Sequence, residues 1–179
     1  GRLVYEKGVD TLLSALALLK DRGYPIRAVI VGSGPEEPAL RTLAARVGLH
    51  EYVELCGAVQ IALIPQYISS LDVLVLPSRS IPTWKEQFGR VLIEAMATGI
   101  PVVGSSCGAI PDVIGRPDLI FPEGDASSLA AILERLIRDP DWRQEVSQYG
   151  LDRVHAHFTN ERIAEQLIAL WQEVLAQDR

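Results

Sequence analysis

The stretch that decides the fold runs from residue 72 to residue 103 and reads DVLVLPSRSIPTWKEQFGRVLIEAMATGIPVV. Its opening run, Asp72–Pro77, has no alternation of polar and apolar residues, which predicts a strand buried on both faces. Phe88–Thr98 predicts a helix, because Gly99 stands just past its end and a proline follows soon after. Pro101–Gly104 predicts a second buried strand. A strand, a helix and a strand in this order indicate a parallel sheet.

The same alternation continues on both sides of this stretch. Further strands are predicted at 27–31, 52–55 and 119–121, with a strand stub at 3–4; helices are predicted at 9–19, 40–47 and 65–70, and three more at 126–138, 141–155 and 159–176. We therefore expect an α/β fold: a Rossmann-like parallel sheet of about six strands, helices on both faces, and a helical C-terminal tail. One domain, 1–179, accounts for the whole chain. Ligands of such sheets bind at the carboxyl ends of the strands.

Composition excludes several classes of protein. The 179 residues are 48% hydrophobic and 22% charged, which is typical of a soluble globular domain. The net charge is −6, and no long run of lysine or arginine occurs, so we expect no nucleic-acid partner. The two cysteines and three histidines show no metal-ligand spacing, and we expect no metal site. With no signal peptide and no apolar run of spanning length, we expect a cytoplasmic protein.

The N-terminus of the predicted helix 88–98 is the first candidate site. Free backbone N–H groups and the positive end of the helix dipole favour a phosphate there, and Gly89 has no side chain to obstruct one. Glu94 lies among apolar neighbours, so we expect it inside the protein, bonded to a ribose diol or else to a nearby arginine or backbone group. Glu86, taken alone, reads as a solvated loop charge; its spacing from Glu94 is what makes it a candidate.

The pattern Glu86–x7–Glu94 resembles the signature of retaining GT-B glycosyltransferases of the family 4 (group 1) type. The likeness extends in order along nearly the whole chain, through the segments GRL at 1–3, EKGVD at 6–10, VGSGP at 31–35, CGAV at 56–59, DVLVLPS at 72–78, EAMATGIPVV at 94–103 and GAIPDVI at 108–114. The resemblance implies one of two Rossmann-like domains that face each other across a cleft, namely the C-terminal domain that binds the nucleotide-sugar donor.

The resemblance also implies roles for individual residues. Glu94 accepts hydrogen bonds from the ribose, and Glu86 contacts the transferred sugar. Arg2 and Lys7 clamp the diphosphate; without the resemblance they would read as plain surface charges. The implied contacts with the remaining parts of the donor, a UDP-sugar or a GDP-sugar, come from the amides around Phe88, Gly89 and Arg90, from the backbone at Val59, and from Ser33. Fixed cations and a helix N-terminus stabilise the departing diphosphate without a metal ion.

Other interpretations stay open at this point. Gly32-Ser-Gly34 follows a strand as in a dinucleotide-binding loop, but Glu37 replaces the third glycine of that motif. A GT-B-like epimerase, a phosphorylase, and a nucleotide-binding module that is inactive by itself are further alternatives. We expect an N-terminal acceptor domain to be absent from this chain and the isolated chain to transfer little or no sugar. We also expect an association with membranes only through that domain.

The last predicted helix carries an apolar stripe that includes Ile163, Leu167 and Trp171. We expect this helix either to fold onto the sheet of its own chain or to form a homodimer. The nucleotide base, the sugar and the acceptor are not specified by the sequence.

Overall fold

The computed structural model describes residues 1–177, with side chains through residue 175. In chain order the elements are η1 (Tyr5–Lys7), α1 (Val9–Asp21), β1 (Ala28–Val31), α2 (Glu37–Arg46), β2 (Val53–Gly57), η2 (Ile61–Leu63), α3 (Ile64–Ser69), β3 (Leu74–Leu76), α4 (Arg90–Ala97), β4 (Val102–Ser105), α5 (Ile110–Ile114), η3 (Pro117–Leu119), β5 (Ile120–Phe121), α6 (Ala126–Arg138), α7 (Pro140–His157) and α8 (Asn160–Gln177). The predicted α/β class is confirmed, and the one helix of five or more residues in the described part of the chain that was not predicted is α5.

All the strands of residues 1–177 pair in parallel, in two groups. One group has the order β1-β2 and the other the order β3-β4-β5, and no ladder between the two groups is present in this part of the chain. Five strands form, close to the six expected. The predicted stub at 3–4 is not one of them: the Leu3 amide donates instead to the carbonyl of Ser33 in the glycine-rich loop, at 2.9 Å.

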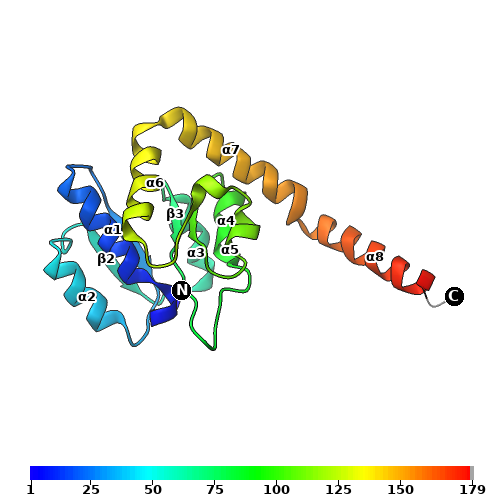
Figure 1. Ribbon diagram of the computed structural model, residues 1–179, viewed down its shortest axis with the longest axis horizontal. Helices are drawn as coiled ribbons and strands as arrows, with labels where there is room; N and C mark the ends of the chain where they lie inside the picture. The colour runs from blue at the N-terminus through cyan, green and yellow to red at the C-terminus, as the bar shows by residue number, and fades with distance from the viewer. Residues whose placement is uncertain (178–179) are drawn as a thin grey trace.

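The core lies between the sheet and its helices. α1 packs against α6, and α4 packs against α7, with Leu92, Phe121 and Leu129 among the fully buried side chains. Figure 1 shows α1 and α2 beside β2 at one end of the body, and α4 and α5 at the other. Asp125 caps α6 as its position suggests, because its carboxylate accepts from the amides of Ser127 and Ser128. The strand ends that carry the site are therefore held by packed helices.

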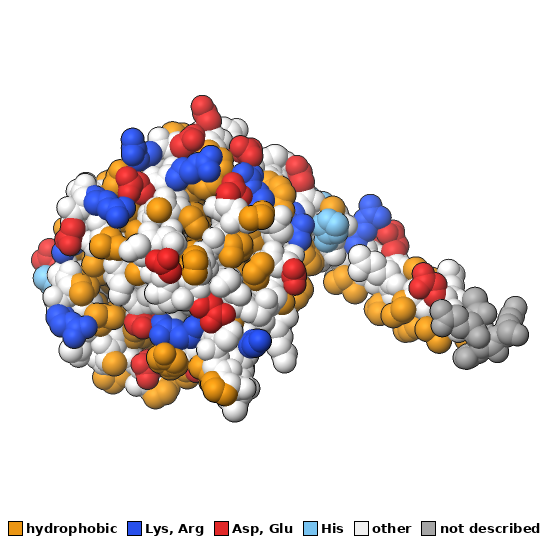
Figure 2. Space-filling model, viewed as in Figure 1, with side chains coloured by type: hydrophobic (Ala, Val, Ile, Leu, Met, Phe, Trp, Pro, Cys, Tyr) orange, Lys and Arg blue, Asp and Glu red, His pale blue; other side chains and the backbone are white. Residues whose placement is uncertain are grey.

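Helix α8 departs from the body of the domain. It projects outward beyond α7 (Figure 1), and its apolar side chains gather along one side of it (Figure 2). Trp171 is 62% exposed and Leu175 is 68% exposed. Of the two outcomes expected for this helix, folding onto its own sheet is wrong, since its contacts within the chain are mainly with α7; the homodimer stays a prediction. None of the helices in the described part of the chain has the length and apolar content needed to cross a membrane.

Candidate nucleotide-sugar site

One cavity of about 530 Å³ opens at the carboxyl ends of β1 and β3. Six of the nine residues singled out from the sequence line it: Arg2, Lys7, Glu86, Gly89, Arg90 and Glu94. These six come from the start of the chain, the loop after β3 and helix α4, so the fold brings together residues far apart in sequence. The side chains of Ser33, Val59 and Phe88 lie outside the lining of this cavity.

Glu86 is tightly bonded within the protein. Its Oε2 atom lies 2.6 Å from Lys7 Nζ and accepts a hydrogen bond of 3.1 Å from the hydroxyl of Ser78. The Glu86 side chain is only 13% exposed. Lys7 Nζ also sits 4.7 Å from the centre of the Trp84 ring, a cation–π contact. Because two donors and an aromatic ring fix this pair, Glu86 has a defined position before any ligand arrives.

The loop that carries Glu86 is anchored through its backbone. The Ala109 amide donates to the carbonyl of Glu86 at 2.9 Å, and the Glu86 amide donates to Cys107 Sγ at 3.5 Å. Gly108 is required at this contact, since a Cβ there would overlap the Glu86 carbonyl oxygen. The loop after β4 therefore acts as the support for the loop after β3.

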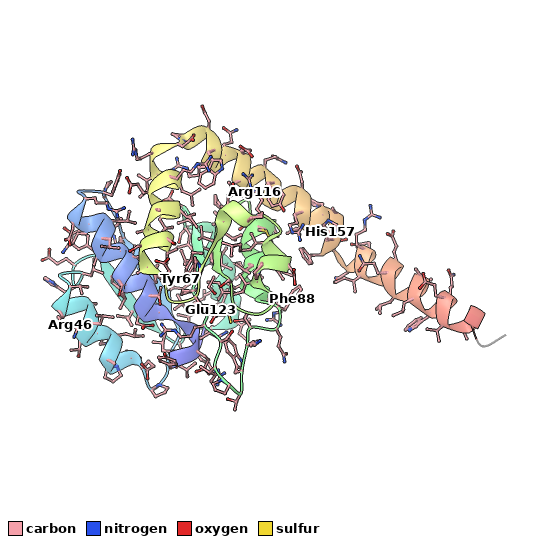
Figure 3. All side chains as sticks on the ribbon, viewed as in Figure 1. Arg46, Tyr67, Phe88, Arg116, Glu123 and His157 are labelled. Atoms are coloured by element: carbon pink, nitrogen blue, oxygen red, sulfur yellow. The ribbon has the colours of Figure 1, made fainter. Side chains whose placement is uncertain are left out.

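A second anchor of the same loop is Glu123, which follows β5. Its carboxylate accepts from the Ser80 amide at 2.6 Å and from the Ser80 hydroxyl at 2.7 Å. Figure 3 shows Glu123 near the middle of the body, close to the labelled Tyr67 in that view. Sequence reasoning missed Cys107 and Glu123. Both follow strands at the carboxyl edge of the sheet, and this placement is the signal that points to them.

Helix α4 begins at Arg90, two residues later than predicted. Gly89 is its N-cap, with φ of 77°, and no side chain caps the helix. The first backbone N–H groups of α4 are therefore left without capping side chains, at the end of the helix that favours anions. A Cβ on Gly89 would lie 2.8 Å from Leu76 Cδ2, so β3 and α4 approach as closely as glycine allows.

Glu94 is not inside the protein, and the prediction that it would be buried is wrong. The buried face of α4 is made by Leu92, Ala95 and Met96, and at 3.6 residues per turn Glu94 lies on the opposite side of the helix. Its side chain is 40% exposed, and its ion pair, with Arg90 one turn earlier, spans 3.6 Å. A loose pair of this kind, which is 83% exposed on the arginine side, holds the carboxylate weakly. Glu94 is thus available to a ligand in the cavity.

The cations at the cavity mouth differ in how firmly they are held. Arg2 is 70% exposed and lies 3.8 Å from Glu6, while Arg90 is mostly exposed as described above. Lys7 is committed to Glu86. Two loosely held guanidinium groups beside a helix N-terminus form a region that attracts an anion.

The glycine-rich loop after β1 receives the chain's own backbone. The Leu3 carbonyl accepts from the Glu36 amide at 3.0 Å, and a Cβ on Gly32 would overlap the carbonyl oxygen of Gly1. The space that a dinucleotide phosphate takes in a G-x-G-x-x-G loop is filled here by residues 1–3, which counts against the dehydrogenase interpretation. Ser33 is exposed at the tip of this loop, and Val59 lies partly exposed in the loop after β2.

The described residues contain no group of three or more histidine, cysteine, aspartate or glutamate side chains placed to hold a metal ion.

The side chain of Phe88 lies away from the cavity: its ring packs edge-on against Phe158 at the end of α7, with 5.8 Å between ring centres. The amides next to Phe88, rather than its ring, belong to the start of α4.

Comparison with known proteins gives the family. The model of the family "Glycosyl transferases group 1" matches residues 1–153. The chain belongs to the group 1 glycosyltransferases. Two relatives of this group 1 chain are alpha-D-kanosaminyltransferase of Streptomyces kanamyceticus, 30% identical over 97% of the chain, and the putative colanic acid biosynthesis glycosyltransferase WcaL of Salmonella typhimurium, 33% identical over 97%. In each case the chain spans 44% of the relative's length.

Solved structures agree with the GT-B-like architecture expected for a group 1 glycosyltransferase. Sucrose-phosphate synthase from Thermosynechococcus elongatus superposes with a TM-score of 0.79 and 32% identity, over 99% of this chain and 44% of that one. The Anabaena protein HepE, solved in complex with UDP, has a TM-score of 0.79 and 28% identity, over 94% of this chain and 47% of that one. The group 1 family and the Rossmann-like fold are confirmed, while retention, the family 4 type, the C-terminal placement and the roles of individual residues stay predictions.

Proposed function

We propose that this chain is the C-terminal, donor-binding domain of a retaining glycosyltransferase of the family 4 type. The observation that carries the proposal is the cavity in which Arg2, Lys7, Glu86, Arg90 and Glu94 meet at the start of α4. A solved relative of matching extent is the C-terminal domain of the group 1 protein LpcC of Francisella tularensis: the two chains align over 89% of this one and 84% of that one, with 26% identity and a TM-score of 0.78.

The proposal places the donor in the cavity in one orientation. The loosely paired carboxylate of Glu94 accepts from the two ribose hydroxyls, and the diphosphate lies between the N-terminus of α4 and the guanidinium groups of Arg2 and Arg90. The sugar then faces Glu86, whose pair with Lys7 has already fixed its position. The base extends toward the loops that carry Ser33 and Val59. HepE was solved with UDP-glucose, which makes a UDP-sugar the first donor to test.

In the reaction, the bond between the anomeric carbon and the diphosphate breaks, and the acceptor oxygen forms the new bond to that carbon. The nucleoside diphosphate leaves with the bonding electron pair, and the proton of the acceptor hydroxyl passes to the departing diphosphate oxygen. Charge grows on the diphosphate as this happens, so the helix N-terminus and the cations lower the barrier electrostatically and no metal ion is needed. For retention, Glu86 as nucleophile and attack on the same face as departure are the two routes that remain.

A second domain completes the enzyme in this proposal. Because the chain spans 44% of the length of its relatives, we infer that an N-terminal acceptor domain forms the other wall of the cleft. The isolated chain then binds donor but transfers little sugar. The whole enzyme is cytoplasmic in this proposal. The exposed apolar face of α8 is covered either by that domain or by a second copy of the chain. Sedimentation of the isolated chain separates these two cases: a dimer that Trp171→Glu dissociates supports self-association.

The test of donor binding is calorimetric titration of the chain with UDP, GDP, ADP and NAD. The proposal predicts saturable binding of one nucleoside diphosphate and none of NAD. Preference for NAD would support the dinucleotide-binding alternative. If no nucleotide binds to the chain joined to its N-terminal domain, the proposal is wrong.

A further inference from the structure

The loop between β3 and α4 contains a tight hairpin whose last residue is Trp84. The Ile81 amide donates to the Trp84 carbonyl at 2.9 Å, and the Trp84 amide donates back to the Ile81 carbonyl at 3.1 Å, so only Pro82 and Thr83 form the turn. A proline at the first turn position fixes φ and stiffens the turn. This loop projects from the body of the domain beside the N-terminus (Figure 1). The hairpin therefore sets the position of Trp84 locally.

The base of this hairpin is tied to the segment that carries Lys7. The Arg79 amide donates to the Glu6 carbonyl at 2.8 Å, and the Arg79 guanidinium pairs with the Asp10 carboxylate. The same guanidinium lies 4.5 Å from the centre of the Tyr5 ring. Because these partners lie on both sides of Lys7 in the chain, the Lys7 backbone has a fixed place beside the hairpin.

The ammonium group of Lys7 lies between two side chains that are two residues apart in this loop. Its Nζ atom is 2.6 Å from Glu86 Oε2 and 4.7 Å from the centre of the Trp84 ring. Lys7 and Glu86 line the cavity and Trp84 does not, so the indole stands behind the ammonium group as seen from the cavity. Trp84 is itself partly buried and packs against the core. Lysine is a flexible point charge, and the aromatic face gives this one a favoured place.

The Lys7 ammonium group keeps a donor for a ligand. An ammonium group has three N–H donors, and the Glu86 carboxylate takes one of them. The Lys7 side chain is 21% exposed, and it lines the cavity. A second N–H is therefore open to the cavity, on the side where the proposed function places the diphosphate. From this position Lys7 can donate to Glu86 and to a phosphate at the same time.

We propose that Trp84 is a positioning residue of the donor site: its indole holds the Lys7 ammonium group where that group bridges the Glu86 carboxylate and the phosphate that bears the sugar. This inference rests on the proposed function, which places the diphosphate at the start of α4. Trp84 acts through Lys7 and does not touch the donor. A nucleotide without the second phosphate does not reach Lys7, so its affinity does not depend on Trp84.

The test is calorimetric titration of the chain with UDP and UMP, or with GDP and GMP if guanine is the preferred base. Trp84→Leu keeps an apolar side chain and removes the aromatic face, so the affinity for the diphosphate falls by about tenfold and that for the monophosphate is unchanged. Trp84→Phe is the matched control: it restores an aromatic face and keeps the affinity for the diphosphate within about threefold. If Trp84→Leu weakens both nucleotides equally, or Trp84→Phe binds as weakly as Trp84→Leu, Trp84 only supports the loop and the proposal is wrong.

A measurement without nucleotide separates this proposal from donor binding. Pairing with Glu86 beside the indole slows the exchange of the Lys7 ammonium protons with water, which NMR of the unliganded chain records. Lys20 and Lys85 are the other lysines of the sequence, and loss of a signal in Lys7→Met assigns it to Lys7. Exchange is expected to be faster in Trp84→Leu and to stay slow in Trp84→Phe.

The two measurements fail in different ways. If the Lys7 ammonium protons exchange equally slowly in Trp84→Leu and in the unsubstituted chain, Trp84 does not position Lys7 and the proposal is wrong, even where UDP binds. If exchange differs as expected and no nucleoside diphosphate binds, the proposed function is contradicted and the hold of Trp84 on Lys7 is still supported.

Discussion

The two carboxylates on either side of the start of α4 make the most informative comparison in this molecule. Glu86 and Glu94 are separated by seven residues and line the same cavity. The Glu86 side chain is 13% exposed, with Lys7 at 2.6 Å and Ser78 at 3.1 Å. The Glu94 side chain is 40% exposed, and its ion pair with Arg90 spans 3.6 Å. One carboxylate is held by the fold, and the other is left for a ligand.

This difference shows that two residues of one motif can have different roles, one in stability and one in ligand binding. Glu86 contributes to stability as well as to the site, because removing its partner leaves a largely buried charge. Glu94 contributes little to stability, because an exposed pair one turn apart in a helix has a small effect. Substitutions around the two carboxylates therefore separate folding from binding.

The largest loss of stability is expected for Lys7→Met. The change keeps the aliphatic stem but leaves the Glu86 carboxylate without its charged donor. Breaking such a pair, which is partly reached by solvent, costs about 2 kcal/mol in the free energy of unfolding, or a fall in Tm of about 4–8 °C. Urea unfolding measures it.

The control for this prediction is the double variant Lys7→Met/Glu86→Gln. It removes the unpaired charge and recovers at least half of the lost stability. If the double variant is as unstable as Lys7→Met, or less stable, the ion pair is not the cause.

The second largest loss of stability is expected for Gly89→Ala. Its φ of 77° is unfavourable for alanine, and the new Cβ would lie 2.8 Å from Leu76 Cδ2. Together these cost about 1.5 kcal/mol. Gly23→Ala is the matched control, since Gly23 has φ of 83° and no atom within 4 Å of its added Cβ. A difference in unfolding free energy between the two variants isolates the close approach of β3 and α4.

A smaller effect is expected for Glu123→Gln, about 1 kcal/mol, because the amide keeps one acceptor for Ser80 and loses the charge. Thermal unfolding measures the loss. Ser80→Ala removes the hydroxyl donor from the same contact, so the effects of the two changes are less than additive in the double variant. Full additivity would mean that Glu123 does not anchor the loop through Ser80.

The smallest effect on stability is expected for Glu94→Ala, within about 0.5 kcal/mol of the unsubstituted chain. Urea unfolding compares it with Glu37→Ala, which breaks a similar pair one turn apart, Glu37–Arg41 at 2.7 Å. A loss above 2 kcal/mol for Glu94→Ala alone would show that this carboxylate is held by the fold after all.

The sequence predicted the order of strands and helices well, because the buried runs around β3 and β4 and the glycine after α4 are strong local signals. Of the nine site residues taken from the family resemblance, six line the cavity and three do not, and their roles stay predictions. The sequence did not predict the exposure of Glu94, since the apolar neighbours of Glu94 in sequence face the core from other sides of the helix. The anchors at Cys107 and Glu123 depend on contacts across the sheet, which local patterns do not record. The position of α8 could not be predicted from the sequence, because an apolar stripe does not specify which surface covers it.

The most direct test of the account is calorimetric titration of the preferred nucleoside diphosphate into Glu94→Ala and Glu37→Ala side by side. Because two charge-assisted hydrogen bonds to the ribose are lost, the affinity of Glu94→Ala for the nucleotide is expected to fall by about tenfold to a hundredfold. The affinity of Glu37→Ala is expected to be unchanged. Equal affinity of the two variants for the nucleotide would contradict the assignment of Glu94, and with it the proposed orientation of the donor.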